Sequence, residues 1–291
     1  MKNPIIVLGM HRSGTTLITK LLSEFNIFWG SDLDENFESM FFHTINEWVL
    51  RRIGGSWSSP NDIKFLYNSP KLVNKVTKIL ENELKSVRFY QYLGLKNILV
   101  KNEILDGNWG WKDPRNILTL PLWLNIFKNP KVIYVKRNGI DIAASLVKRQ
   151  KEYVESENFN PFIKFTFKQK IKNLLSPIEI YQYNALRCIN LLEAYQLWEV
   201  YTETAEQIYL DLSVPKFAFK YEDLLSEPYN TLKKMVGFLE VSSNDVEIQN
   251  LVSKINFSRK YAFKSHDNLI RFYREHKDDK IMKLLNYDQL L

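Results

Sequence analysis

The chain has 291 residues, 45% of them hydrophobic, and carries a formal net charge of +7 at neutral pH. This length and apolar content predict a single domain over residues 1–291 with a large core. No apolar stretch approaches the roughly 20 residues that span a bilayer, and the first residues lack the pattern of a secretory signal, so we expect a cytoplasmic protein without a transmembrane segment. The single cysteine, Cys188, excludes a disulfide framework and a cysteine-based zinc site, and we expect it to be buried.

The positive net charge favours an anionic partner, and a nucleotide, an acidic glycan or a nucleic acid would each satisfy it. The lysines and arginines are spread along the chain without a dense basic run. This distribution argues against a nucleic-acid partner. Neither composition nor charge predicts an oligomeric state.

The first pattern along the chain is a short apolar run, a glycine turn and a helix. Residues 5–9 predict a strand and residues 14–25 predict a helix, with "GMHRSGTT" between them. Such a turn gathers backbone N–H groups around an anion at the positive end of a helix. The standard nucleotide-hydrolysing loop is G-x-x-x-x-G-K-[ST], and here Thr15 stands where that lysine would be. The sequence therefore predicts an anion site of a different kind.

Strand and helix patterns alternate in the rest of the chain. Residues 131–136 and 216–221 predict buried strands, and residues 139–150 and 228–239 predict the helices that follow them. This alternation is typical of a P-loop-like three-layer α/β fold, with a central parallel sheet, helices on both faces and the binding crevice at the carboxyl ends of the strands.

Long helical stretches are inserted between these units. Apolar positions at three- and four-residue spacing predict helices over 36–52, 70–91 and 178–208. Residues 151–176 have mixed signals, and we interpret them as a lid or an insertion.

The residues that follow the predicted strand at 131–136 argue against a metal site. In ATP- and GTP-using loops a later strand ends in an aspartate that helps to hold magnesium. Here Lys136 and Arg137 occupy that place. Because both this aspartate and the lysine of the nucleotide-hydrolysing loop are absent, we expect protein cations to bind the anion directly, without a metal. A phosphosulfate suits such a site, since the transferred sulfuryl group carries less charge than a phosphoryl group.

Two segments resemble the signatures of the sulfotransferase family, which moves a sulfuryl group from 3′-phosphoadenosine-5′-phosphosulfate (PAPS) to a hydroxyl or amine. "GMHRSGTTL" resembles its 5′-phosphosulfate loop in the arginine form found in many bacterial members, and "VIYVKRNGIDIAASL" resembles its 3′-phosphate signature. "GWKDPRN" and "FKYEDLLSEP" resemble two further family segments. The resemblance implies that the co-substrate is bound by His11, Arg12, Ser13, Gly14, Thr15, Thr16, Arg137 and Ser145.

The spacing of the second signature has a physical basis. Arg137 leaves the end of a strand, and Ser145 lies two turns along the next helix, where it faces back toward that end. Both side chains can therefore reach one phosphate.

Other roles follow from where charge develops. Arg12 and Lys112 are placed to stabilise the negative charge that builds on the oxygen leaving the sulfuryl group. Arg259 and Lys260 either add a late contact to the 3′-phosphate or form a solvated basic turn. His11 either contacts phosphate or packs.

Four further residues have mainly structural interpretations. Trp109 and Trp111 are expected to pack into the core rather than to stack on adenine or acceptor. Glu222 and Asp223 are expected to hold the loop architecture rather than to act in catalysis.

The general base is less evident. The histidine of the cytosolic small-molecule branch has no counterpart here, since Asp113 lies near its position. The glycan and tyrosylprotein branches use a glutamate after the first helix, and the corresponding segment reads "GSDLDENFESMFFH". Asp34 and Glu38 are our candidates, against the alternative that these acids cap the following helix.

The leading hypothesis is a sulfotransferase that passes the sulfuryl group of PAPS to a hydroxyl, with carbohydrate as the favoured acceptor class. One alternative is a metal-dependent P-loop nucleotide or small-molecule kinase. The other is a non-catalytic binder of acidic polymer, which would rest on the +7 charge alone.

Overall fold

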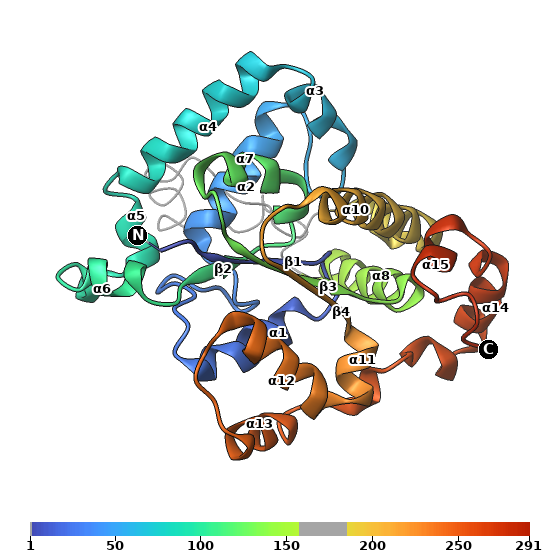
Figure 1. Ribbon diagram of the computed structural model, residues 1–291. Coiled ribbons are helices and arrows are strands. Elements are labelled where there is room, and N and C mark those ends of the chain that lie inside the picture. The colour runs from blue at the N-terminus through green and yellow to red at the C-terminus, as the bar shows by residue number, and fades with distance from the viewer. Residues whose placement is uncertain (1, 157–184) are drawn as a thin grey trace.

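The computed structural model describes residues 2–156 and 185–291 (Figure 1). Within them a four-stranded parallel sheet has the order β2-β1-β3-β4. The strands are β1 (Ile5–Leu8), β2 (Gly110–Lys112), β3 (Lys131–Lys136) and β4 (Lys216–Lys220). Helices cover both faces of this sheet, so the predicted three-layer α/β architecture is confirmed (Figure 1).

The helices have the following bounds: α1 (Thr15–Leu22), α2 (Met40–Arg52), α3 (Ile63–Tyr67), α4 (Pro70–Lys85), α5 (Phe89–Leu93), α6 (Lys101–Asp106), α7 (Asn116–Ile126), α8 (Gly139–Glu155), α10 (Leu191–Asp211), α11 (Tyr221–Ser226), α12 (Pro228–Leu239), α13 (Asp245–Val252), α14 (Asp267–His276) and α15 (Lys280–Leu284).

Alternate residues of β1 enter two separate hydrophobic cores, because successive side chains of a strand point to opposite faces. Ile6 and Leu8 belong to the larger core, which includes α2, α7, α8 and α10. Ile5 and Val7 belong to the smaller core, which includes α1, α12 and α13. All four side chains are buried, as expected for a parallel strand that is covered on both sides.

The register of β1 and β3 determines where the functional loops lie. Ile5 pairs with Lys131 and Leu8 pairs with Tyr134, so the two strands run side by side in one direction. Their carboxyl ends therefore meet at the same edge of the sheet. The loop after β1 and the residues after β3 are neighbours there.

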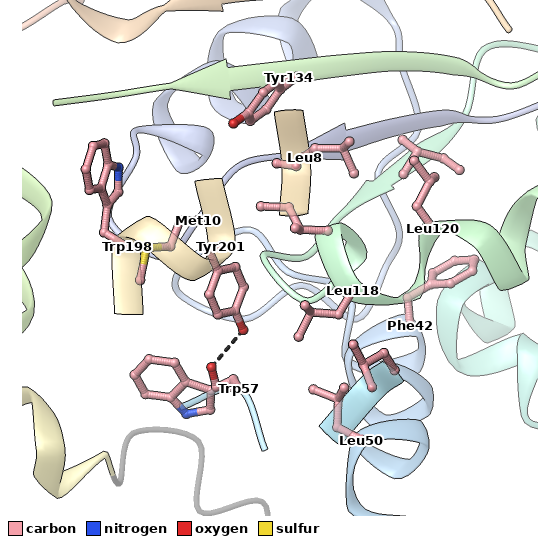
Figure 2. Packing of buried hydrophobic residues seen from close by; sticks show 14 of the residues in the cluster. Leu8, Met10, Phe42, Leu50, Trp57, Leu118, Leu120, Tyr134, Trp198 and Tyr201 are labelled. Atoms are coloured by element: carbon pink, nitrogen blue, oxygen red, sulfur yellow. Dashed lines mark hydrogen bonds between the residues drawn. The ribbon is translucent and has the colours of Figure 1, made fainter. Parts of the chain in front are cut away.

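Aromatic side chains fill the larger core next to the opening loop (Figure 2). Trp198 and Tyr201 of α10 belong to this core together with Leu8 and Met10, and the Tyr201 hydroxyl donates a hydrogen bond to the carbonyl of Trp57 at 2.8 Å (Figure 2). Deeper in this core Trp109 and Trp111 are fully buried. Their predicted role in core packing is confirmed.

The inserted helices differ in their bounds from the sequence prediction. The helix expected from residue 36 begins at Met40, because Asp32 accepts the amide N–H of Phe41 at 2.7 Å and the preceding residues form a loop. The helix expected over 70–91 is two helices, α4 and α5, because the backbone is extended at Ser86.

Within the described residues, the helix predicted over 178–208 begins at Leu191. Asn190 caps α10 by accepting the amide N–H groups of Leu192 and Glu193. Residues 178–184 of that prediction lie outside the described residues, as does most of the predicted lid, 157–176. The first part of the lid segment continues helix α8 as far as Glu155.

Two further expectations concern the chain as a whole. In residues 2–156 and 185–291 no helix has the length and apolar character needed to cross a membrane. Cys188 is buried, as predicted, and burial raises the pKa of its thiol to about 11.

Candidate active site

The loop between β1 and α1 has a glycine where no side chain would fit. Gly14 precedes the first residue of α1 and has a φ of 98°, a conformation that glycine adopts without strain. A Cβ atom at this position would also clash with the ring of Tyr221. The first-turn amides of a helix have no partners within that helix, so the N–H groups after Gly14 are available to an anion.

This loop borders a large cavity of about 1180 Å³ at the carboxyl ends of the strands. Its wall is formed by the loop, the end of β2, the end of β3 with helix α8, and residues 259–269. The predicted site residues that line it are His11, Arg12, Gly14, Thr15, Thr16, Glu38, Lys112, Arg137, Ser145 and Arg259. The structure thus brings together residues from distant parts of the chain.

Hydrogen bonds join the two predicted phosphate signatures directly. Nε of Arg12 donates to Oγ of Ser145 at 2.8 Å, and Nη1 of Arg137 donates to the carbonyl of Arg12 at 2.9 Å. Nη2 of Arg137 donates to the carbonyl of Arg259 at 3.3 Å. The loop after β1, the end of β3, helix α8 and the segment at residue 259 therefore meet at one point.

The same residues form a cluster of positive charge. Burial lowers the pKa of Arg12, and the charges of Arg137 and Arg259 lower it further. Like charges this close destabilise one another, and a bound anion would relieve the repulsion. The cluster therefore has the character of an anion site.

The ring of Tyr221 contacts residues of both signatures, Arg137 and Gly14. The guanidinium of Arg137 lies 4.6 Å from the centroid of its ring, and Gly14 lies so close to the same ring that a Cβ atom there would clash with it. Gly14 and Arg137 are thus on the same side of the molecule. One elongated ligand can reach both.

Glu222 and Asn138 fix the chain just after β3. Oε1 of Glu222 accepts the amide N–H of Asn138 at 2.9 Å, and Oε2 accepts the hydroxyl of Tyr287 at 2.8 Å. The side chain of Asn138 in turn caps α8 by accepting two amide N–H groups. Glu222 is fully buried in these contacts, which place Arg137 and the start of α8.

Lys112 links three elements at the inner end of the cavity. It is almost completely buried, and its Nζ donates to Oε1 of Glu38 at 3.0 Å and to the carbonyl of Asn36. Nζ also lies 3.5 Å from Oγ1 of Thr16 in α1. The ammonium group is therefore held beside the anion loop.

Glu38 is an ionised carboxylate among cations. Burial acts to raise its pKa, but the charges of Lys112 and Arg115 and a hydrogen bond with His43 outweigh this effect and lower it. Oε2 lies 3.4 Å from Nδ1 of His43 and 3.8 Å from Nη1 of Arg115. Both oxygens of the Glu38 carboxylate therefore have buried partners.

The comparisons with known proteins agree with this geometry. A model of the sulfotransferase family matches residues 4–245. The chain belongs to the sulfotransferase family. Sulfuryl transfer is therefore its class of reaction. A search of curated proteins gave no match.

One solved sulfotransferase domain shows the same fold, and two further solved sulfotransferases are also similar to the chain. A sulfotransferase domain from the curacin biosynthetic pathway is 16% identical, with a TM-score of 0.50 over 94% of this chain and 97% of that one. The domain from the Synechococcus PCC 7002 olefin synthase is 15% identical over 92% and 85% of the two chains, with a TM-score of 0.45. Mouse SULT7A1 complexed with PAP is 14% identical over 89% and 65%, with a TM-score of 0.44.

Three predicted site residues of this sulfotransferase are not among the residues that line the cavity in the described part of the chain. Ser13 is buried beneath the loop, and its amide N–H donates to the carbonyl of Met10. Lys260 is exposed, with its Nζ 5.9 Å from the ring centroid of Tyr261. Asp34 and Glu38 both lie in the loop before α2, which begins at Met40.

Asp34 shapes that loop. Its Oδ1 accepts the amide N–H groups of Asn36 at 2.9 Å and Glu38 at 2.7 Å. These bonds hold Asn36 and Glu38 where both contact Lys112. The position of Asp34 is thus that of a supporting residue in the sulfotransferase site.

Arg115 is a central residue to which the sequence patterns assigned no role. It is fully buried, its Nε donates to Glu47 at 2.9 Å, and its Nη1 donates to Oδ1 of Asp113 at 2.9 Å. Oδ2 of Asp113 accepts from Asn46, so both of its oxygens have protein partners. Arg115 stands within "GWKDPRN", but no spacing rule shows that a guanidinium there meets carboxylates from α2.

Proposed function

We propose that this sulfotransferase takes its sulfuryl group from PAPS and passes it to an acceptor hydroxyl, with carbohydrate as the favoured acceptor class. The observation that carries the proposal is the direct contact between the two signatures, in which Arg12 bonds Ser145 and Arg137 bonds the carbonyl of Arg12. A ligand with a charged group at each end, such as an adenosine 3′,5′-bisphosphate, fits such a pair of neighbouring anion sites.

Each end of the nucleotide has its own residues in this proposal. The first-turn amides of α1, the hydroxyls of Thr15 and Thr16 and the guanidinium of Arg12 would hold the 5′-phosphosulfate. Arg137 and Ser145, with Arg259 beside them, would hold the 3′-phosphate. Lys260 would contribute only long-range charge, because its ammonium group is directed to Tyr261.

The chemistry needs charge stabilisation at the leaving group. As the sulfuryl group moves, negative charge builds on the bridging oxygen of the bisphosphate, and Arg12 and Lys112 both border the cavity at that end. Glu38 holds Lys112 in place. Donors that are held in position before the reaction stabilise such charge without reorganising.

We further propose that no metal takes part. A metal-dependent kinase would need an acid at the end of β3, where this chain has Lys136. The acid after β2, Asp113, already has protein partners. At the end of β3, Lys136 pairs with Glu206 at 2.8 Å, and after β2 the carboxylate of Asp113 binds Arg115 and Asn46.

The outer part of the cavity supports a hydroxyl-rich acceptor. Its lining includes apolar side chains such as Val147, Leu191 and Phe263 and the following polar and charged ones: Lys148, Lys151, Glu152, Asn190, His266 and Asn268. These hydrogen-bond donors and acceptors suit sugar hydroxyls.

Calorimetry with two nucleotides tests the proposal. Adenosine 3′,5′-bisphosphate should bind equally well with and without EDTA, and ATP with magnesium should bind weakly. Tight binding of ATP with magnesium and none of the bisphosphate would reject PAPS and favour the kinase. Transfer of labelled sulfate from PAPS to a panel of oligosaccharides, lipids and small alcohols then tests the acceptor class.

A further inference from the structure

His11 has a buried ring nitrogen that the contacts described so far do not use. The residue is 8% exposed and lines the cavity next to Arg12. Among the described residues its Nε2 has no hydrogen-bond partner. A buried polar atom without a partner is costly, and in an active-site cavity it indicates a contact to a ligand.

The core holds the ring in a defined orientation. The imidazole packs against the indole of Trp57, with ring centroids 4.4 Å apart and an interplanar angle of 53°. Trp57 is itself buried, and its carbonyl accepts the hydroxyl of Tyr201 (Figure 2). This packing on a buried indole restricts the orientation of the His11 ring.

Burial and the charges around His11 favour a neutral ring. Burial lowers its pKa well below the usual value, the cations Arg149, Arg115 and Lys112 lower it further, and Glu38 opposes them. A neutral imidazole has a nitrogen lone pair that can accept a proton. The negative charge of a bound PAPS would offset the neighbouring cations and make the ring more basic when the co-substrate is present.

Three other candidate bases, Glu38, Asp34 and His43, are already engaged. Glu38 binds Lys112, and Asp34 accepts two backbone N–H groups. His43 lies on the cavity wall, but its Nδ1 is 3.4 Å from Glu38 and 3.3 Å from Arg115.

We propose that Nε2 of His11 accepts the proton of the acceptor hydroxyl during sulfuryl transfer, an inference that rests on the proposed use of PAPS. The acceptor oxygen forms a bond to sulfur, and the bond from sulfur to the bridging oxygen breaks. The electron pair of the broken bond remains on the phosphate oxygen of the bisphosphate. The hydroxyl proton moves to Nε2 of His11 and later to solvent.

Kinetics of the His11→Gln and His11→Ala variants test this role, with PAPS as donor and water as the acceptor that every preparation contains. We expect kcat for bisphosphate release to fall about 100-fold or more in both variants, as is typical when a general base is lost. The Kd of adenosine 3′,5′-bisphosphate should stay within about threefold of wild type. Added imidazole should restore part of the rate of His11→Ala, because it can occupy the space of the lost ring.

Matched histidine variants serve as controls. His276→Gln removes a ring that pairs with Asp279 and packs on Tyr195, and it should leave the rate unchanged. An unchanged rate in His11→Gln, or a loss confined to His43→Gln, would overturn the proposal. A loss of bisphosphate affinity in proportion to the loss of rate would make His11 a nucleotide ligand instead and would also overturn it.

Nuclear magnetic resonance measures the pKa of the His11 ring, which should not change on ligand binding if His11 has only a structural role. The chain has four histidines, so the ring of His11 can be assigned by comparison with His11→Gln. We expect a neutral ring at pH 7 in the free protein and a rise of its pKa when the bisphosphate binds. A pKa that does not change on binding would contradict the proposal, whereas an absence of bisphosphate binding to wild type would reject the proposed use of PAPS itself.

Discussion

Arg12 is held in a left-handed backbone conformation, with a φ of 71°, at the turn of the opening loop. A residue other than glycine adopts this conformation rarely, and such strain is concentrated at functional sites. In this conformation Arg12 makes hydrogen bonds to two residues of the other signature, one through its side chain and one through its backbone. The guanidinium bonds Ser145 while the carbonyl accepts from Arg137.

Replacement of Arg12 by alanine should lower kcat for bisphosphate release from PAPS by about 10²- to 10³-fold, the usual loss for one donor at a developing negative charge. Steady-state kinetics with saturating PAPS would measure it. Arg88→Ala is the control, since Arg88 is exposed and pairs with Glu83 on the surface. A similar loss in both variants would argue against a role at the leaving group.

Glu38 predicts a pH dependence of stability. Because its pKa is lowered in the folded state, the stabilisation it contributes is complete above the unfolded value of about 4.3 and is lost as the pH falls through that value toward the folded pKa. Urea unfolding of wild type should therefore show a falling free energy below about pH 4.3.

The Glu38→Gln variant removes this titrating group. It should be less stable than wild type at pH 7, because Lys112 and Arg115 lose a buried counter-charge, and its stability should decline less steeply on acidification. Parallel pH profiles for the two proteins would show that Glu38 is not the group that couples stability to pH.

Among the elements, the turn from β1 into α1 depends most closely on one residue. Gly14 needs a positive φ and also needs open space beside Tyr221. Gly54 has a positive φ of 83°, but a Cβ atom added there would have no neighbour within 4 Å. A comparison of substitutions at these two positions therefore distinguishes the effect of backbone strain from that of a steric clash.

Gly54→Ala should cost about 1–2 kcal/mol of unfolding free energy, the usual penalty of a left-handed conformation. Gly14→Ala should cost more and should also weaken bisphosphate binding, because Tyr221 must move and Arg137 packs on its ring. Chemical unfolding and calorimetry of the two variants would test this. Equal stability and equal affinity in both would contradict the role of the Tyr221 contact.

At the scale of the whole molecule, the cavity joins segments that are far apart in the chain. Arg137 contacts the loop after β1 and the segment at Arg259, and Asp141 of α8 accepts the amide N–H of Phe263 at 2.8 Å. A ligand at this junction would contact several of these segments at once. It should therefore stabilise the whole domain.

Adenosine 3′,5′-bisphosphate at 100 times its Kd should stabilise the protein by about 2.7 kcal/mol. This corresponds to a rise in Tm of about 5 °C or more for a chain of this size. In Arg137→Ala the rise should disappear at the same concentration, whereas Lys75→Ala, an exposed change on α4, should keep it. A rise that survives in Arg137→Ala would show that this arginine does not bind the nucleotide.

The local patterns predicted the elements around the site well. Strand β3 has the predicted bounds, and β1, α1, α8 and α12 lie where the apolar periods placed them. These elements are short and their chemistry is local: a buried apolar run, a glycine turn and a cap at Asn138. The inserted helices were predicted less well, because their bounds depend on contacts such as that of Asp32 with Phe41.

The amino-acid sequence by itself determined the parallel α/β framework and the glycine turn at Gly14, because both follow from periodicity and spacing along a few residues. The pairing of that turn with Arg137 was implied by the resemblance to the sulfotransferase family. The tertiary structure alone decided which partners the acids and histidines near the cavity have. It surrounded Arg115 with the carboxylates of Glu47 and Asp113, paired Glu38 with Lys112, and left Nε2 of the cavity-lining His11 without a hydrogen-bond partner among the described residues. The physical reason is that the charge state and the availability of a side chain depend on neighbours from other elements, which no local pattern in the sequence specifies.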